Sequence, residues 1–277
     1  MQSTIITHTK PHLDEVMAVW LIRRYFDSFS RAKVKFISAE NGGADKINPD
    51  QDPKILYIGV GRGKFDEHRG LTASCTTSLV WRDVKKNQGR DARPRVCTIA
   101  VDRIVEYVLR EDTGKLVEMT DRIFSVQNIL WGYYDDNKQS SEKMIEFGQS
   151  IIDALFSEQQ KQVNLETAWK TKKSFQTKWG RAVAIKADEK GLSGLAFQKG
   201  YELIIGVNPK NGYHGFRAKA QGKVDLTEIY QKIKEIEPEA DWFLHQSKKL
   251  LLCGGDVAPK ARKSKMRLEE MVELVKK

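Results

Sequence analysis

The chain has 277 residues, of which 40% are hydrophobic and 30% are charged. This length suffices for one large domain or two ordinary ones, and the apolar fraction suffices for a sizeable core. No apolar run is long enough to cross a membrane, and the N-terminus lacks a basic stretch followed by a long apolar one. We therefore expect neither a transmembrane helix nor a secretory signal.

The net charge of +10 favours anionic partners, of which nucleic acid is the commonest. A soluble basic protein without such a partner is the alternative. The chain has three cysteines, Cys75, Cys97 and Cys253, too few and too scattered for a disulfide framework or a cysteine-based zinc site. This usage indicates a reducing compartment, so we expect a cytoplasmic protein.

The first half of the chain alternates predicted strands with predicted helices. Strands are expected at 3–8, 34–37 and 55–58, and helices at 13–29, 74–84, 98–112 and 116–126. Polar residues and glycines predict a loop over 39–53. Because strands that alternate with helices pair in parallel, this half predicts a mostly parallel α/β sheet.

The second half has a different pattern. Residues 141 to about 175 read as helical and increasingly basic, and after Gly180 short strands and helices follow. Strands are expected at 182–185, 201–207, 214–220, 242–245 and 250–252, and helices at 225–236 and 263–277. The Asn211-Gly212 pair predicts a hairpin turn. We therefore expect a domain over 1–140, connecting helices over 141–180 and a smaller α+β domain over 181–277.

The segment after the first predicted strand carries the strongest chemical signal. His8, His12 and Asp14 lie within seven residues, at a strand-to-helix turn. Imidazole and carboxylate suit manganese, iron or zinc, and open α/β sheets bind ligands at such turns. In the alternative interpretation the histidines are turn residues and Asp14 is the N-cap of the following helix.

A second signal follows the apolar strand at 55–58. Gly59, Gly61 and Gly63 precede Asp66-Glu67-His68. The glycines do not match a phosphate-binding loop, and we expect them to let the backbone approach a metal site. A charged surface loop is the alternative for 66–68. Cys75 could pair with a histidine as a nucleophile, although a buried, inert cysteine is the simpler interpretation.

Together these segments resemble the DHH phosphoesterase superfamily. His8-x-x-Pro11-His12-x-Asp14 resembles its first motif, H-x-x-P-D-x-D, with a second histidine reminiscent of the MYG-type branch. Asp66-Glu67-His68 resembles the Asp-His-His motif, and Asp121 resembles the isolated aspartate of the fourth. The run from Trp242 to Met266, with Cys253-Gly254-Gly255, resembles the closing segment of that branch.

The resemblance implies one or two divalent cations, usually manganese, with magnesium or zinc as alternatives. The implied ligands are His8 and His12 for the first metal and Asp14, Glu67 and Asp121 for the second; His68 would face the phosphate, and Asp66 is the second catalytic candidate. Two departures stand out, because the superfamily has an aspartate where this chain has Gly59 and a histidine where it has Glu67. Asp66, Glu15 or Asp102 are possible replacements. A rearranged two-metal site, a single metal and an inactive site all remain open.

The C-terminal region offers candidate substrate-binding residues. A terminal phosphate or nucleotide could bind His245, Gly254, Gly255, Lys260, Arg262 and Lys263; a basic solvated tail is the alternative. Basic residues between 170 and 181 alternate with Trp169, Phe175 and Trp179, which suits single-stranded nucleic acid, unless the aromatic rings pack between domains.

The predicted function is metal-dependent hydrolysis of phosphodiester ends in single-stranded RNA, DNA or short oligonucleotides. The first alternative is a module that has lost turnover and binds nucleic acid or an acidic partner. The second is a hydrolase for a small phosphorylated metabolite. No membrane partner is expected, and a homodimer is possible.

Overall fold

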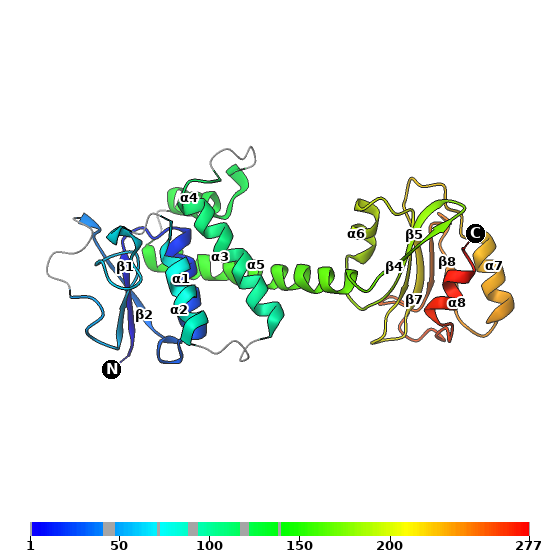
Figure 1. Ribbon diagram of the computed structural model, residues 1–277, viewed down its shortest axis with the longest axis horizontal. Helices are drawn as coiled ribbons and strands as arrows, with labels where there is room; N and C mark the ends of the chain where they lie inside the picture. The colour runs from blue at the N-terminus through cyan, green and yellow to red at the C-terminus, as the bar shows by residue number, and fades with distance from the viewer. Residues whose placement is uncertain are drawn as a thin grey trace. The chain divides into compact units, whose positions relative to one another are not determined.

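The computed structural model describes residues 2–40, 48–70, 73–87, 94–116, 122–137 and 140–276. Over these residues the chain is an α/β protein that divides into two compact units, Met1–Gln160 and Lys161–Lys277 (Figure 1). Each unit has its own sheet, as the alternation of predicted elements indicated.

The first unit has a parallel sheet of three strands, in the order β2-β1-β3. The strands are β1 (Thr4–His8), β2 (Lys33–Ile37) and β3 (Ile55–Tyr57). This confirms the predicted parallel sheet. Because neighbouring parallel strands end at the same edge, the turn after His8 and the loop after Tyr57 leave the sheet side by side.

In the described part of this unit, the sheet is accompanied by the helices α1 (Leu13–Tyr25), α2 (Thr76–Asn87), α3 (Arg95–Asp112) and α4 (Val126–Asn137), and by α5 (Ser141–Trp169), which continues into the second unit. Short 3-10 turns are η1 (Asp27–Phe29), η3 (Glu67–Arg69) and η4 (Arg122–Phe124). The helix expected over 13–29 ends at Tyr25. The prediction of a helix over 116–126 is wrong. The described residues of that range include the short turn η4, and helix α4 begins only at Val126.

Helix α1 is buried on every side over its first ten residues. All residues from Leu13 to Ile22 are buried, which takes Asp14 and Glu15 of its first turn into the interior. Helix α5 packs closely on it, because a Cβ at Gly148 would lie 2.4 Å from Val16 Cγ1. A helix so enclosed is held in one position by its neighbours, and so are its polar side chains.

The second unit is built on a mixed sheet of six strands, in the order β4-β5-β6-β7-β9-β8. The strands are β4 (Lys173–Thr177), β5 (Gly180–Lys186), β6 (Leu203–Val207), β7 (His214–Ala218), β8 (Trp242–Leu244) and β9 (Leu250–Cys253). Only β5 and β6 pair in parallel.

Helices cover both faces of this sheet (Figure 1). Helix α6 (Leu192–Gln198) and the end of α5 form one core, and α7 (Thr227–Ile236) and α8 (Leu268–Glu273) form the other. Helix α6 was not predicted. The second sheet thus carries a core on each face, whereas the first unit has one large core.

Two predicted helices are shorter than expected. The helical run expected to about residue 175 ends at Trp169, because Lys173–Thr177 pair with β5 as a hairpin. The C-terminal helix expected over 263–277 covers only Leu268–Glu273. Before it the chain is held extended: Ser264 N–H donates to Cys253 Sγ at 3.2 Å.

The two units differ in charge. Basic and acidic residues are equal in number over 1–160, so the entire net charge of +10 belongs to residues 161–277. The second unit is therefore the part that attracts anions at long range. In the described residues no helix has the length and apolar character that a membrane crossing requires.

Candidate metal centre

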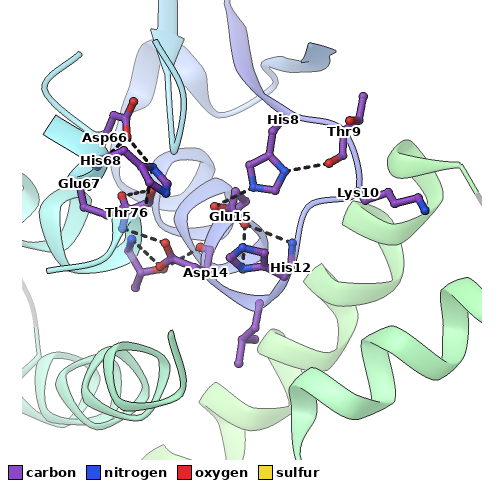
Figure 2. Close-up of polar contacts among 12 residues, drawn as sticks. His8, Thr9, Lys10, His12, Asp14, Glu15, Asp66, Glu67, His68 and Thr76 are labelled. Carbon is purple, nitrogen blue, oxygen red and sulfur yellow. Dashed lines mark hydrogen bonds and ion pairs between the residues drawn. The ribbon is translucent and has the colours of Figure 1, made fainter. Parts of the chain in front are cut away.

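The turn between β1 and α1 presents two histidines to one carboxylate (Figure 2). His8 Nδ1 lies 2.8 Å from the carbonyl oxygen of Thr9, and its Nε2 lies 3.2 Å from Glu15 Oε1. The other oxygen, Glu15 Oε2, lies 3.1 Å from His12 Nδ1. A ring nitrogen held by a carbonyl oxygen sets the orientation of the opposite nitrogen, as is usual for histidines that bind metals.

Glu15 is buried and engaged by both histidines. Its Oε2 also accepts the backbone N–H of His12 at 3.1 Å, so the carboxylate is fixed at the first turn of its own helix. Burial alone would raise the pKa of Glu15, but the charges of His12 and His8 lower it overall. Burial lowers the pKa of His8, but the hydrogen bond to Glu15, the charge of Glu15 and the contacts with Thr9 and Asp14 together outweigh this and raise it to about 9. His8 and Glu15 therefore form an ion pair.

Gly59 lies against the Glu15 carboxylate. Its φ is +63°, and a Cβ there would lie 2.8 Å from Glu15 Oε1 and 3.2 Å from Thr76 Oγ1. The possible replacements for an aspartate at position 59 were Asp66, Glu15 and Asp102, and Glu15 is the one whose carboxylate lies in the space beside Gly59. Asp102 instead accepts Trp81 Nε1–H at 2.7 Å. The absence of a side chain at Gly59 is thus what admits Glu15 between His8 and Thr76.

The segment Asp66-Glu67-His68 lies on the side of Glu15 opposite His8 (Figure 2). Asp66 is buried, and its oxygens accept Arg62 N–H at 2.6 Å and His68 N–H at 3.0 Å. His68 Nδ1 lies 2.9 Å from Asp66 Oδ1, while 66% of the His68 side chain is exposed. Glu67 Oε2 accepts Thr76 Oγ1–H at 2.8 Å. Asp66 therefore orients His68, and Glu67 is directed toward Thr76.

The electrostatics of this segment follow from burial and from neighbouring charges. Burial raises the pKa of Glu67 overall. Burial lowers the pKa of His68, but the hydrogen bond to Asp66 and the charge of Glu67 raise it overall. Both Glu67 and His68 therefore hold a proton to a higher pH than they would in water.

Asp14 points away from the two histidines. Its Oδ2 accepts Thr76 N–H and its Oδ1 accepts Thr77 N–H, each at 2.8 Å. Asp14 therefore caps helix α2, and the alternative in which it is the N-cap of its own helix is wrong, because that position is His12. This direction does not favour the option of a single metal on His8, His12 and Asp14.

Asp112, at the end of α3, joins Asp14. One ligand atom each of Asp14, Cys75 and Asp112 lie within 4.8 Å of one another. Burial, followed by the charge of Glu15, raises the pKa of Asp14 well above its ordinary value, and burial raises that of Asp112. Burial and Asp14 also raise the pKa of the Cys75 thiol, which disfavours a nucleophilic thiolate. Asp121 lies outside the described residues.

Sequence reasoning missed Asp112 and Thr76. Asp112 is the last residue of the helix predicted over 98–112, and Thr76 opens the helix predicted over 74–84. A polar residue at a helix end near the ligand-binding edge of a sheet is the signal that could have identified each of them.

The described residues thus form three groups of potential ligands: His8-His12-Glu15, Asp14-Cys75-Asp112 and Asp66-Glu67-His68. Imidazole with carboxylate is a donor set for manganese, iron or zinc. The space beside Gly59 that a Cβ would fill is taken by a carboxylate, which keeps the donors close together. On both observations the residues fit a divalent cation.

The candidate substrate-binding residues of the second unit are not brought together. His245 follows β8 and pairs with Leu250 at the start of β9, whereas Gly254 follows the end of β9. His245 and Gly254-Gly255 therefore lie at opposite ends of the β8–β9 hairpin. A Cβ at Gly254 would lie 2.5 Å from Tyr213 Cδ1, so the glycine is needed for close packing of that ring.

The three basic candidates differ in their surroundings. Arg262 forms ion pairs with Asp241 and Glu239, each at 2.8 Å. The Lys263 ammonium lies 5.8 Å from the centre of the Tyr213 ring. Lys260 is exposed and lines an open groove of about 720 Å³.

The aromatic residues near the start of the second unit pack within that unit. Trp169 is buried against α6 and its neighbours, and Phe175 and Trp179 pack on the opposite core. Lys173 and Lys178 each form an ion pair with a glutamate, at 3.0 and 2.7 Å. The interpretation in which these rings stack on nucleic acid is therefore not favoured.

Comparison with known proteins gives weak similarities. No family model and no curated protein matches the chain. A solved structure of the pGpG-specific phosphodiesterase PggH from Vibrio cholerae is 12% identical, covers 91% of this chain and 92% of its own, and superposes with a TM-score of 0.35. The DHH domain of a member of a family of ribosomal proteins is 12% identical, covers 100% of this chain and 88% of its own, with a TM-score of 0.33. Similarity at this level assigns neither a family nor an activity.

Proposed function

We propose that the chain is a metal-dependent phosphoesterase of DHH type that hydrolyses phosphodiester ends of single-stranded nucleic acid or short oligonucleotides. The observation that carries the proposal is that His8, His12 and Glu15 gather at one turn, while Glu67, from another segment, is hydrogen-bonded to Thr76, which lies beside Gly59 as Glu15 does. These residues come from separate segments and offer imidazole and carboxylate donors, a mixed set that suits manganese, iron or zinc.

The residues divide into two sets of donors. His8, His12 and Glu15 would hold one cation, and Asp14, Glu67 and Asp112 supply carboxylates for a second. A divalent cation there supplies a Lewis acid that activates water and offsets charge on a phosphate. Burial is the main cause of the raised pKa values of these three carboxyls, and a divalent cation beside them would offset the cost of burying their negative charges.

The remaining groups bind and orient the substrate. The Asp66 carboxylate accepts hydrogen bonds from both the backbone and the ring of His68, which turns the opposite ring nitrogen toward solvent. An exposed imidazole held in this way can donate a hydrogen bond to a phosphate oxygen. The positive charge of the second unit, with Lys260 and Lys263 among its exposed residues, favours a polyanionic substrate.

The test combines metal content with turnover. Protein purified without chelator is analysed for bound elements, and a dinucleotide is offered with manganese. We expect bound metal and hydrolysis in the natural chain and loss of both in His8→Ala. Glu106→Ala, which removes an exposed carboxylate of α3, is the control and should keep both.

Two other results would assign a different function. Binding that weakens steeply with salt, with no turnover in manganese, magnesium, cobalt or zinc, identifies a binding module without catalysis. Preference for small nucleotides over oligonucleotides in competition identifies a metabolite hydrolase. Manganese-dependent hydrolysis that survives His8→Ala refutes the proposed site.

A further inference from the structure

A cavity of about 180 Å³ opens beside the candidate metal centre within the first unit. Its polar wall includes His12, Asp14 and Asp112, which belong to the candidate ligand groups. Its other walls include Val108 and Trp131. A cavity of roughly 150 Å³ holds a benzene ring, so this one has room for a planar ring beside the ligand groups.

Two residues on one face of α4 line this cavity. Gln127 and Trp131 are four residues apart, so their side chains lie on the same side of the helix. Gln127 Oε1 accepts the backbone N–H of Leu13 at 2.9 Å, which fixes the amide, and the Nε2 of that amide carries two donor hydrogens. The Trp131 side chain is 38% exposed. The wall formed by α4 thus offers an aromatic face and an oriented donor.

We propose that this cavity is a nucleobase subsite, in which Trp131 stacks on the base next to the hydrolysed phosphate and the Gln127 amide donates to the base edge. The inference rests on the proposed function and adds that the substrate is recognised as a nucleoside ester in the first unit itself. Stacking on an indole ring accepts every base, whereas a hydrogen bond from an amide requires an acceptor on the edge.

The placement of the cavity favours a base over other occupants. A nucleotide carries a flat ring and a phosphate joined by one sugar, and the cavity combines an aromatic wall with the residues assigned to the cation. A phosphorylated metabolite without a ring would leave Trp131 uncovered. A protein partner would more readily use Ile123 and Phe124 of η4, which are 71% and 78% exposed and do not line the cavity.

The test measures equilibrium binding, so it does not depend on turnover. The ligands are a thymidine dinucleotide with a methylenephosphonate linkage, which resists hydrolysis, and its abasic counterpart. In the full chain, Trp131→Ala should weaken binding of the base-bearing ligand about 10- to 100-fold and leave the abasic ligand unchanged. Trp131→Phe should restore most of the loss. Phe124→Ala, an aromatic truncation on the neighbouring turn, should bind like the natural chain.

The other possible outcomes distinguish failure of the nucleobase subsite from failure of the proposed phosphoesterase function. If Trp131→Ala weakens binding of both ligands equally, Trp131 only supports the structure. If it weakens binding of neither, the Trp131 ring does not contact the ligand and is available to a protein partner. Either result overturns the inference. An equal effect of Phe124→Ala also overturns it. Base-dependent binding through Trp131 without hydrolysis of a natural dinucleotide keeps the subsite and refutes only the phosphoesterase.

Discussion

The carboxylate of the candidate metal centre should be exchangeable between two positions, Glu15 and Gly59. Glu15 Oε1 lies 3.2 Å from His8 Nε2 and 2.8 Å from the point that a Cβ of residue 59 would occupy. A carboxylate attached at residue 59 would therefore begin where the present one ends. We expect Glu15→Ala to lose metal affinity, and Glu15→Ala combined with Gly59→Asp to recover part of it.

The magnitudes follow from the contacts. Loss of a group that only supports a ligand costs about 10- to 100-fold in metal affinity, so loss of Glu15 itself should cost at least about 100-fold, or ~2.7 kcal/mol. The double variant should recover at least about tenfold, since aspartate tolerates the positive φ of residue 59 better than most residues. Gly59→Asp alone should destabilise the fold by about 1–3 kcal/mol, because its Cβ meets Glu15 Oε1.

The assay is calorimetric titration of manganese into metal-free protein, with urea unfolding to confirm that each variant is folded. Glu106→Ala serves as the control for removal of a helical carboxylate in the same unit. A folded double variant that binds metal no better than Glu15→Ala would refute the exchange. Unchanged affinity in Glu15→Ala would remove Glu15 from the ligand set.

Three further predictions concern stability. Asp14→Ala should lower the free energy of unfolding by about 2 kcal/mol, measured in urea, because two buried N–H donors at the start of α2 lose their acceptor. In thermal melts, Gly148→Ala should destabilise the fold by about 1–3 kcal/mol, because the added Cβ meets Val16. Gly132→Ala, whose added Cβ on α4 meets no neighbour, should be neutral or stabilising in the same measurement. Burial raises the pKa of Glu237, but hydrogen bonds from Ser264 and the Lys265 backbone lower it overall below its ordinary 4.5. The contribution of ionised Glu237 to the free energy of unfolding is therefore complete above pH 4.5 and is lost as the pH falls further. The difference in this free energy between the natural chain and Glu237→Gln should shrink on acidification below pH 4.5. A difference that grows there would contradict the assignment.

Local patterns in the sequence predicted much of the secondary structure. The apolar run at 55–58 and the helical spacing after Leu13 correspond to β3 and α1, since each depends on residues only a few positions apart. Strand β4 was missed because its residues also fit a continuing helix. Its pairing with β5 decides the conformation, and a helical pattern does not report that pairing.

The candidate site was predicted in part. Spacing alone singled out His8, His12 and the Asp66-His68 segment, because those residues are close in the chain. The direction of Asp14 was not predictable, since its hydrogen-bond donors are about sixty residues away at the start of α2. The identity of the carboxylate beside Gly59 required knowing which of three candidates reaches it.

By itself, then, the sequence determined that the chain is α/β, that its first sheet is parallel and that histidines and carboxylates gather after the first strand. Only the tertiary structure decided that α1 is enclosed on every side, that Asp14 caps a distant helix and that Glu15 fills the space left by Gly59. The reason is physical. Periodicity and turn residues act over a few neighbouring positions, whereas the direction of a buried polar side chain is set by whichever donors and acceptors the packed helices bring to it.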